Sequence, residues 1–68
     1  MINGYKSLYK TLGLKNRKGL EKMLSQKMSC DISCTEQNGG LLIGSLELYF
    51  PCTEEDFWSV VEVAEKRT

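Results

Sequence analysis

The chain has 68 residues, with nine Lys plus Arg, nine Asp plus Glu, three Cys and no His. A chain of this length forms one small domain, residues 1–68, and buries only about 60% of its unfolded surface, so it is marginally stable alone. Its 41% apolar and 26% charged content excludes an intrinsically disordered chain. We therefore expect one folded α+β or all-α unit.

Three features bear on the location of the protein. Residues 1–6 lack the basic and apolar regions of a secretory signal. The longest charge-free run, residues 37–46, contains three Gly and is far shorter than the roughly 20 residues of a membrane-spanning helix. Three cysteines are too few for a disulfide scaffold. We expect a cytoplasmic protein with free thiols and no membrane contact.

The two halves of the chain carry opposite charges. Residues 1–30 have seven basic side chains against Glu21 alone, a net charge of +6, and residues 31–68 have a net charge of −6. This asymmetry favours an anionic partner for the basic half, or head-to-tail self-association. The alternative is a solvated surface whose two halves fold against each other.

Apolar residues recur at helical spacing in the first half. One such set predicts a helix over residues 4–12, and Gly13 then takes the left-handed position that often follows a helix. A second set, preceded by the N-cap residue Asn16, predicts a helix over residues 17–28. Residues 4–28 thus form a basic helical pair. The two apolar sets are Tyr5, Leu8, Tyr9 and Leu12, and Leu20, Met23, Leu24 and Met28.

The period changes to two after the second helix, which predicts a β-hairpin over residues 29–50. Its second strand covers residues 41–50. A two-residue turn would pair Cys34 with Ile43, whereas a three-residue loop would pair Cys34 with Gly44. The phase of the apolar residues favours the three-residue loop, with a bulge at Gly40.

An acidic helix is predicted over residues 54–66. Pro51 ends the strand before it, Thr53 caps it, and acidic residues occupy its first turn. Phe57 belongs to its core stripe, whereas Trp58 lies to one side of that stripe. The expected fold is a small single α+β domain in the order α-α-β-β-α, with an antiparallel β-hairpin packed on helices.

The predicted second strand is apolar on both faces, and an isolated hairpin has two unpaired edges. A homodimer through the hairpin edge would answer both problems. The alternative is that the helical pair covers one face of the hairpin and the third helix covers the other.

Basic residues at the start of the second helix oppose the helix dipole, and a phosphate bound by the amides there would remove the conflict. The first 30 residues are therefore a candidate nucleic-acid surface. A solvated or protein-facing surface is the alternative. The segment from Leu8 to Leu24 departs from the helix-turn-helix pattern at Tyr9 and Gly19, so we assign no family. The candidate nucleic-acid-binding residues are Lys6, Lys10, Lys15, Arg17, Lys18 and Lys22.

We expect no enzyme, no cofactor and no metal site. The chain has no His and no paired-carboxylate motif, and it is too short to enclose a substrate. Cys30 and Cys34 would lie about 13 Å apart along a strand, too far for a disulfide or a shared zinc. We predict buried, inert thiols.

The leading hypothesis is an intracellular protein–protein interaction module, an adaptor or inhibitor that acts by occupying a surface. Compact accessory proteins of phages and mobile elements have this size. Trp58 is the best anchor residue, although it also fits a role as a roof over the core edge. The candidate protein-binding residues are Trp58, Glu62, Glu65 and Ile43. The alternative function is a small DNA- or RNA-binding regulator that uses the basic helical pair.

Overall fold

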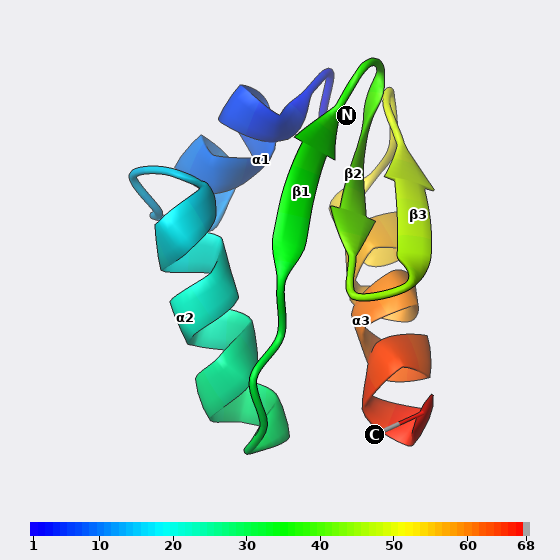
Figure 1. Ribbon diagram of the computed structural model, residues 1–68. Coiled ribbons are helices and arrows are strands. Elements are labelled where there is room, and N and C mark those ends of the chain that lie inside the picture. The colour runs from blue at the N-terminus through cyan, green and yellow to red at the C-terminus, as the bar shows by residue number, and fades with distance from the viewer. Residues whose placement is uncertain (68) are drawn as a thin grey trace.

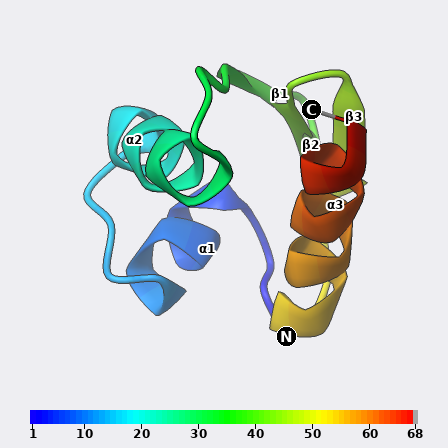
Figure 2. The same cartoon turned by 90° about the horizontal axis from the view of Figure 1, so that it is seen from below.

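The computed structural model describes residues 1–67 and contains three helices and one antiparallel sheet with the strand order β1-β2-β3. All three helices lie on one side of the sheet (Figures 1 and 2). The α+β class is confirmed, with the element order α-α-β-β-β-α. The elements are α1 (Tyr5–Thr11), α2 (Arg17–Met28), β1 (Cys34–Gln37), β2 (Gly40–Ile43), β3 (Leu46–Tyr49) and α3 (Glu54–Arg67).

The helices α2 and α3 begin where their capping residues predict. The Asn16 side chain accepts a hydrogen bond from the Gly19 N–H at 3.1 Å, which satisfies one free amide of the first turn of α2. Before α3, the Thr53 hydroxyl accepts from the Asp56 N–H at 3.1 Å, and the Asp56 carboxylate accepts from the Thr53 N–H at 3.0 Å. This reciprocal capping box fixes the first turn of α3.

The predicted strand over residues 41–50 is wrong, because the chain reverses direction at Gly44 and Ser45. Gly44 has a φ of 61°, a conformation that glycine adopts without steric cost. Ile43 consequently pairs with Leu46 across a two-residue turn. In one continuous strand these two residues would point to opposite faces, whereas across this turn they share a face. Because of this reversal, most of the apolar residues that appeared to lie on two faces of one strand lie on one face of the sheet.

The predicted three-residue loop is also wrong. Cys34 pairs with Ile43, and Gln37 pairs with Gly40, so the turn consists of Asn38 and Gly39 alone. Gly39, the second central residue of this turn, has a φ of 75°, a left-handed conformation that glycine adopts without steric cost. Gly40 is an ordinary residue of β2, and no bulge occurs there. Residues 29–33 form no strand, so β1 begins five residues after the predicted start of the hairpin.

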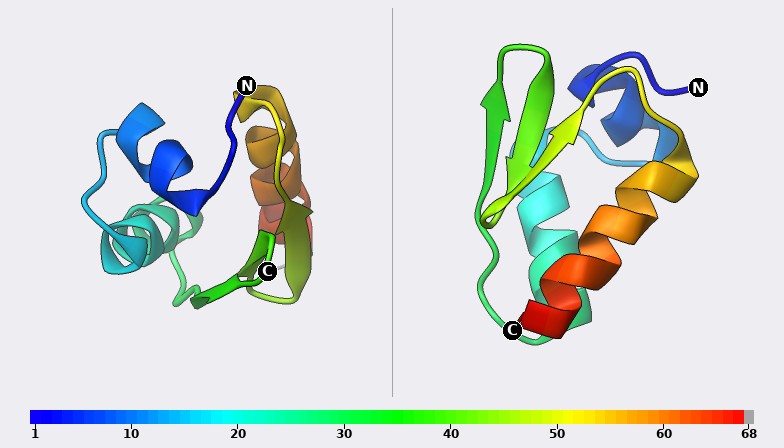
Figure 3. Two further views of the ribbon diagram at one scale, coloured as in Figure 1. Left: turned by 90° about the horizontal axis from the view of Figure 1, so that it is seen from above. Right: turned by 90° about the vertical axis from the view of Figure 1, so that its right-hand side faces the viewer.

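The core lies between one face of the sheet and the three helices. The N-terminal segment closes one end, because Ile2 and Cys52 exchange main-chain hydrogen bonds of 2.6 and 2.9 Å. The other face of the sheet carries no helix (Figure 3), so the alternative in which the helical pair covers one face and the third helix covers the other is wrong. The buried core residues are Ile2, Leu8, Tyr9, Leu20, Leu24, Cys34, Leu41, Ile43, Leu48, Cys52, Phe57 and Val61.

Candidate functional site

The basic helices and the acidic helix lie on opposite sides of the molecule. α1 and α2 stand on the left of Figure 1 and α3 stands on the right. Five exposed lysines lie on α1, on α2 and on the segment that joins them, and we call this set the lysine face. In residues 1–67 none of the five takes part in an ion pair. The lysine face consists of Lys6, Lys10, Lys15, Lys18 and Lys22.

Arg17 does not belong to this free surface. Its guanidinium donates a hydrogen bond to the Cys34 carbonyl at 2.9 Å and lies 3.5 Å from the Glu21 carboxylate. The same Glu21 oxygen accepts from the Cys34 N–H at 2.9 Å. We call this arrangement the Arg17–Glu21 clamp. Glu21 and the Cys34 carbonyl thus bind the Arg17 guanidinium, which we expected a phosphate to bind. The assignment of Arg17 to nucleic-acid binding is therefore unsupported.

Trp58 lies on the flank of α3 that faces α2, and its side chain is held from several directions. The indole Nε1 donates to the Glu54 carboxylate at 3.3 Å, and the Phe57 ring packs edge-on at 4.9 Å between centroids. The Lys27 ammonium lies 5.9 Å from the ring centroid and 3.8 Å from the Glu65 carboxylate. Trp58 remains 36% exposed. We call these residues, without the buried Phe57, the Trp58 cluster: Lys27, Glu54, Trp58 and Glu65.

The other two candidate protein-binding residues differ sharply in exposure. Ile43 is 0% exposed, because its side chain points from β2 into the core. Its assignment as a contact residue is therefore wrong. Glu62 is exposed on α3 and lies 3.5 Å from the Lys66 ammonium.

The three cysteines are free thiols. Burial, with the nearby Glu21 carboxylate, raises the pKa of the Cys34 thiol to about 11. Burial also raises the pKa of Cys52, whereas Cys30 is only half-buried. Within residues 1–67 no three acidic or cysteine side chains lie together as a metal site would require.

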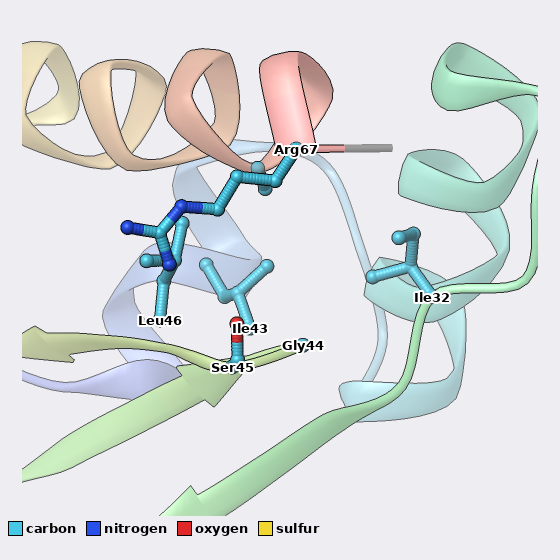
Figure 4. A pocket seen from close by; sticks show the side chains of 7 residues that line it. Ile32, Ile43, Gly44, Ser45, Leu46 and Arg67 are labelled. Atoms are coloured by element: carbon cyan, nitrogen blue, oxygen red, sulfur yellow. The ribbon is translucent and has the colours of Figure 1, made fainter.

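A small hollow of about 160 Å³ lies between the end of α3 and the turn that joins β2 to β3 (Figure 4). Apolar side chains line it, and the Arg67 side chain extends along its edge over Leu46. Its volume is below the roughly 300 Å³ at which small-molecule sites begin. The hollow depends on the Gly44-Ser45 turn, so the sequence interpretation had no means of finding it.

Sequence reasoning also missed Lys27 and Glu54 as parts of the Trp58 cluster. The spacing of four residues between Glu54 and Trp58 is a signal for their contact on one helix face. No sequence signal brings Lys27, which lies 31 positions before Trp58, to the same place.

The chain matches no family model, no curated protein and no solved structure. Among residues 1–67, no helix combines the length and apolar character needed to cross a membrane.

Proposed function

We propose that this domain is a protein–protein interaction module that acts by occupying a surface, with the Trp58 cluster as its contact. The observation that carries the proposal is the fixed presentation of Trp58, whose indole is held by Glu54 and lies beside Lys27 while part of its ring stays exposed. An aromatic side chain that is already ordered loses little conformational entropy on binding. Tryptophan is also enriched among residues that dominate binding energy.

The charges around Trp58 favour a particular class of partner. Glu54, Glu62 and Glu65 share the α3 flank of Trp58 by helical spacing. Lys27 and Lys66 pair with Glu65 and Glu62, so three carboxylates against two ammonium groups leave this flank with a net negative charge. A surface with a net negative charge steers a positively charged partner and orients it. The partner in this proposal therefore has an apolar pocket rimmed by Lys or Arg side chains.

The test compares three immobilised proteins in capture from an extract of the source cells. We expect the wild-type chain and Val63→Ala to retain the same partner, and Trp58→Ala to lose it. Val63 is a matched control because it is an exposed apolar residue, 42% accessible, on another flank of the same helix. Titration with the purified partner should show at least a tenfold loss of affinity for Trp58→Ala, about 1.4 kcal/mol. Equal affinity of Trp58→Ala and wild type would remove the Trp58 cluster as the contact.

A second candidate function is nucleic-acid binding, which the five unpaired side chains of the lysine face favour. Fluorescence anisotropy with duplex DNA, single-stranded DNA and RNA at about 50 and 200 mM salt tests it, because phosphate contacts weaken steeply with salt. The double variant Lys18→Glu and Lys22→Glu should abolish such binding and preserve the fold. Arg17 is unsuitable for this variant because it belongs to the Arg17–Glu21 clamp. Absence of binding at the lower salt concentration excludes the second function.

A further inference from the structure

The two edges of the sheet differ in what they offer to another strand. Directly before β1, the Ser33 carbonyl accepts a hydrogen bond from the Gly44 N–H at 2.8 Å. Main-chain groups alternate in direction along an antiparallel strand, so Cys34 and Glu36 direct theirs away from β2. The Arg17–Glu21 clamp occupies both groups of Cys34. Only Glu36 then remains, and one residue is too little for another strand to pair with.

The β3 edge has two such residues in succession. The Phe50 N–H donates to the Gly39 carbonyl at 3.0 Å, so by the same alternation Glu47 and Tyr49 direct their main-chain groups away from β2. Nothing within residues 1–67 hydrogen-bonds to those groups. In the right-hand view of Figure 3, β3 lies in front of the other strands, with α3 beside it. This edge is open to an incoming strand.

The residues of β3 are complementary to a second copy of themselves. In an antiparallel pair centred on Leu48, each Glu47 lies opposite the partner copy's Tyr49, and Leu46 lies opposite Phe50. Leu46, Leu48 and Phe50 share the inner face, so apolar side chains meet apolar side chains. On the outer face the Tyr49 hydroxyl already donates to the Glu47 carboxylate within one chain. In the pair, the Tyr49 hydroxyl of each chain would also lie opposite the Glu47 carboxylate of the other chain.

The neighbouring registers are less favourable. Centring the pair on Glu47 would place two carboxylates directly opposite each other, and like charges in that position destabilise a sheet. Centring it on Tyr49 would place Glu47 opposite Pro51, which has no N–H to donate. The register centred on Leu48 avoids both problems and lets Glu47 and Tyr49 of each chain use all their free main-chain groups.

We infer that β3 pairs antiparallel with β3 of a second copy in this register, which joins the two sheets into one of six strands. Because the Arg17–Glu21 clamp blocks the β1 edge, the assembly closes at two copies and does not extend into a fibre. α3 adds apolar area beside the joined edges. Val60 and Val63 precede Arg67 by seven and four residues on one helix flank, and Arg67 lies over Leu46 of β3 (Figure 4).

This inference goes beyond the proposed function and rests on separate residues. Trp58 lies on the α3 flank that reaches α2 through Lys27, away from Val60 and Val63. The dimer therefore leaves both Trp58 clusters exposed. Trp58→Ala tests the proposed function and leaves the β3 edge unchanged. Substitutions at Glu47 or Tyr49 test the dimer and leave the Trp58 cluster unchanged.

Sedimentation equilibrium across a concentration series up to the millimolar range tests the dimer. We expect the wild-type mass to approach twice the 7.7 kDa of one chain. Tyr49→Glu should be monomeric, because it places two carboxylates opposite each other. The double variant Glu47→Lys and Tyr49→Glu should dimerise again, because each Lys then faces a Glu. Thr35→Glu is the matched control, since Thr35 is exposed on β1 at the blocked edge, and it should remain dimeric.

Circular dichroism must show that each variant is folded. Should Tyr49→Glu fail to fold, Glu47→Pro replaces it, because the Glu47 N–H has no partner within the chain and its loss affects only pairing between copies. A wild-type chain that stays monomeric throughout the series overturns the inference. A folded double variant that remains monomeric overturns the register.

Discussion

Arg17 and Glu21, one turn apart on α2, each bind one main-chain group of Cys34, at 2.9 Å in both cases. Their own charges lie 3.5 Å apart, so the arrangement is neutral as a whole. It joins the basic helix to the edge of the sheet at a position where a further strand would otherwise supply the hydrogen bonds. The clamp thus secures β1 and blocks its edge.

Loss of the clamp should lower the free energy of unfolding. Glu21→Ala leaves the buried Cys34 N–H without an acceptor, which costs about 2 kcal/mol, and Arg17→Ala should cost about 1 kcal/mol. Glu21→Gln retains an acceptor oxygen and should cost less than Glu21→Ala. Urea denaturation measures these differences, with Lys22→Ala as the exposed control on the same helix, expected within about 0.5 kcal/mol of wild type. Equal stability of Glu21→Ala and Lys22→Ala would contradict the role of the clamp.

Gly40 is required for a different reason from the turn glycines. A Cβ atom at this position would lie 2.6 Å from the Leu48 carbonyl oxygen, in main chain that cannot move without disturbing β3. We expect Gly40→Ala to cost more than about 2 kcal/mol, and Gly39→Ala, at a φ of 75°, to cost about 1 kcal/mol. Gly4→Ala is the control, because a Cβ there meets nothing within 4 Å. Thermal denaturation in which Gly39→Ala unfolds at a lower temperature than Gly40→Ala would contradict this order.

The helices could be predicted because their signals are local. Asn16 and Thr53 hydrogen-bond to amides three residues away, and the apolar spacing of each helix is visible within a few turns. The sheet was harder. Ile43 and Leu46 are both apolar, and only the tight turn between them tells whether they share a face. Whether this segment is one continuous strand or two strands joined by a two-residue turn depends on the conformation of Gly44 and Ser45 alone.

The candidate site likewise combines residues whose exposure the sequence predicts with residues whose contacts it does not predict. The exposure of Trp58 and of the lysines on α1 and α2 follows from helical periodicity, which the sequence displays. The burial of Ile43 follows from the β2 to β3 turn, and the capture of Arg17 by Cys34 joins residues 17 positions apart. Contacts of that kind depend on how α2 packs beside β1, which no local pattern encodes.

The three thiols should differ in reactivity. A thiol reacts as its thiolate, and a pKa of about 11 leaves roughly one Cys34 in a thousand ionised at about pH 8. Cys34 and Cys52 are also buried, whereas Cys30 is half-buried. Titration with a thiol-reactive disulfide should show one fast thiol and two that react only as the protein unfolds. Cys30→Ser should remove the fast phase, and a fast phase that survives this substitution would contradict the assignment.

The hydrogen bond between Tyr9 and Glu36 should make stability depend on alkaline pH. The Tyr9 hydroxyl donates to the Glu36 carboxylate at 2.7 Å, and burial together with this carboxylate raises the pKa of Tyr9 above its ordinary value of 10.0. The folded chain therefore holds the phenolic proton to a higher pH than the unfolded chain does. By linkage, the stabilisation is fully present below about pH 10 and is lost as the pH rises further.

Tyr9→Phe should cost about 1 kcal/mol near neutral pH through the lost hydrogen bond, and it should make the alkaline loss of stability shallower. Urea denaturation over a series of pH values measures both effects. Tyr5→Phe is the control on the same helix, because its hydroxyl makes no hydrogen bond within residues 1–67, and it should leave the stability near neutral pH unchanged. An alkaline profile of Tyr9→Phe that parallels wild type would show that the Tyr9 proton does not contribute to the folding equilibrium, since only a group whose pKa differs between the two states makes stability change with pH.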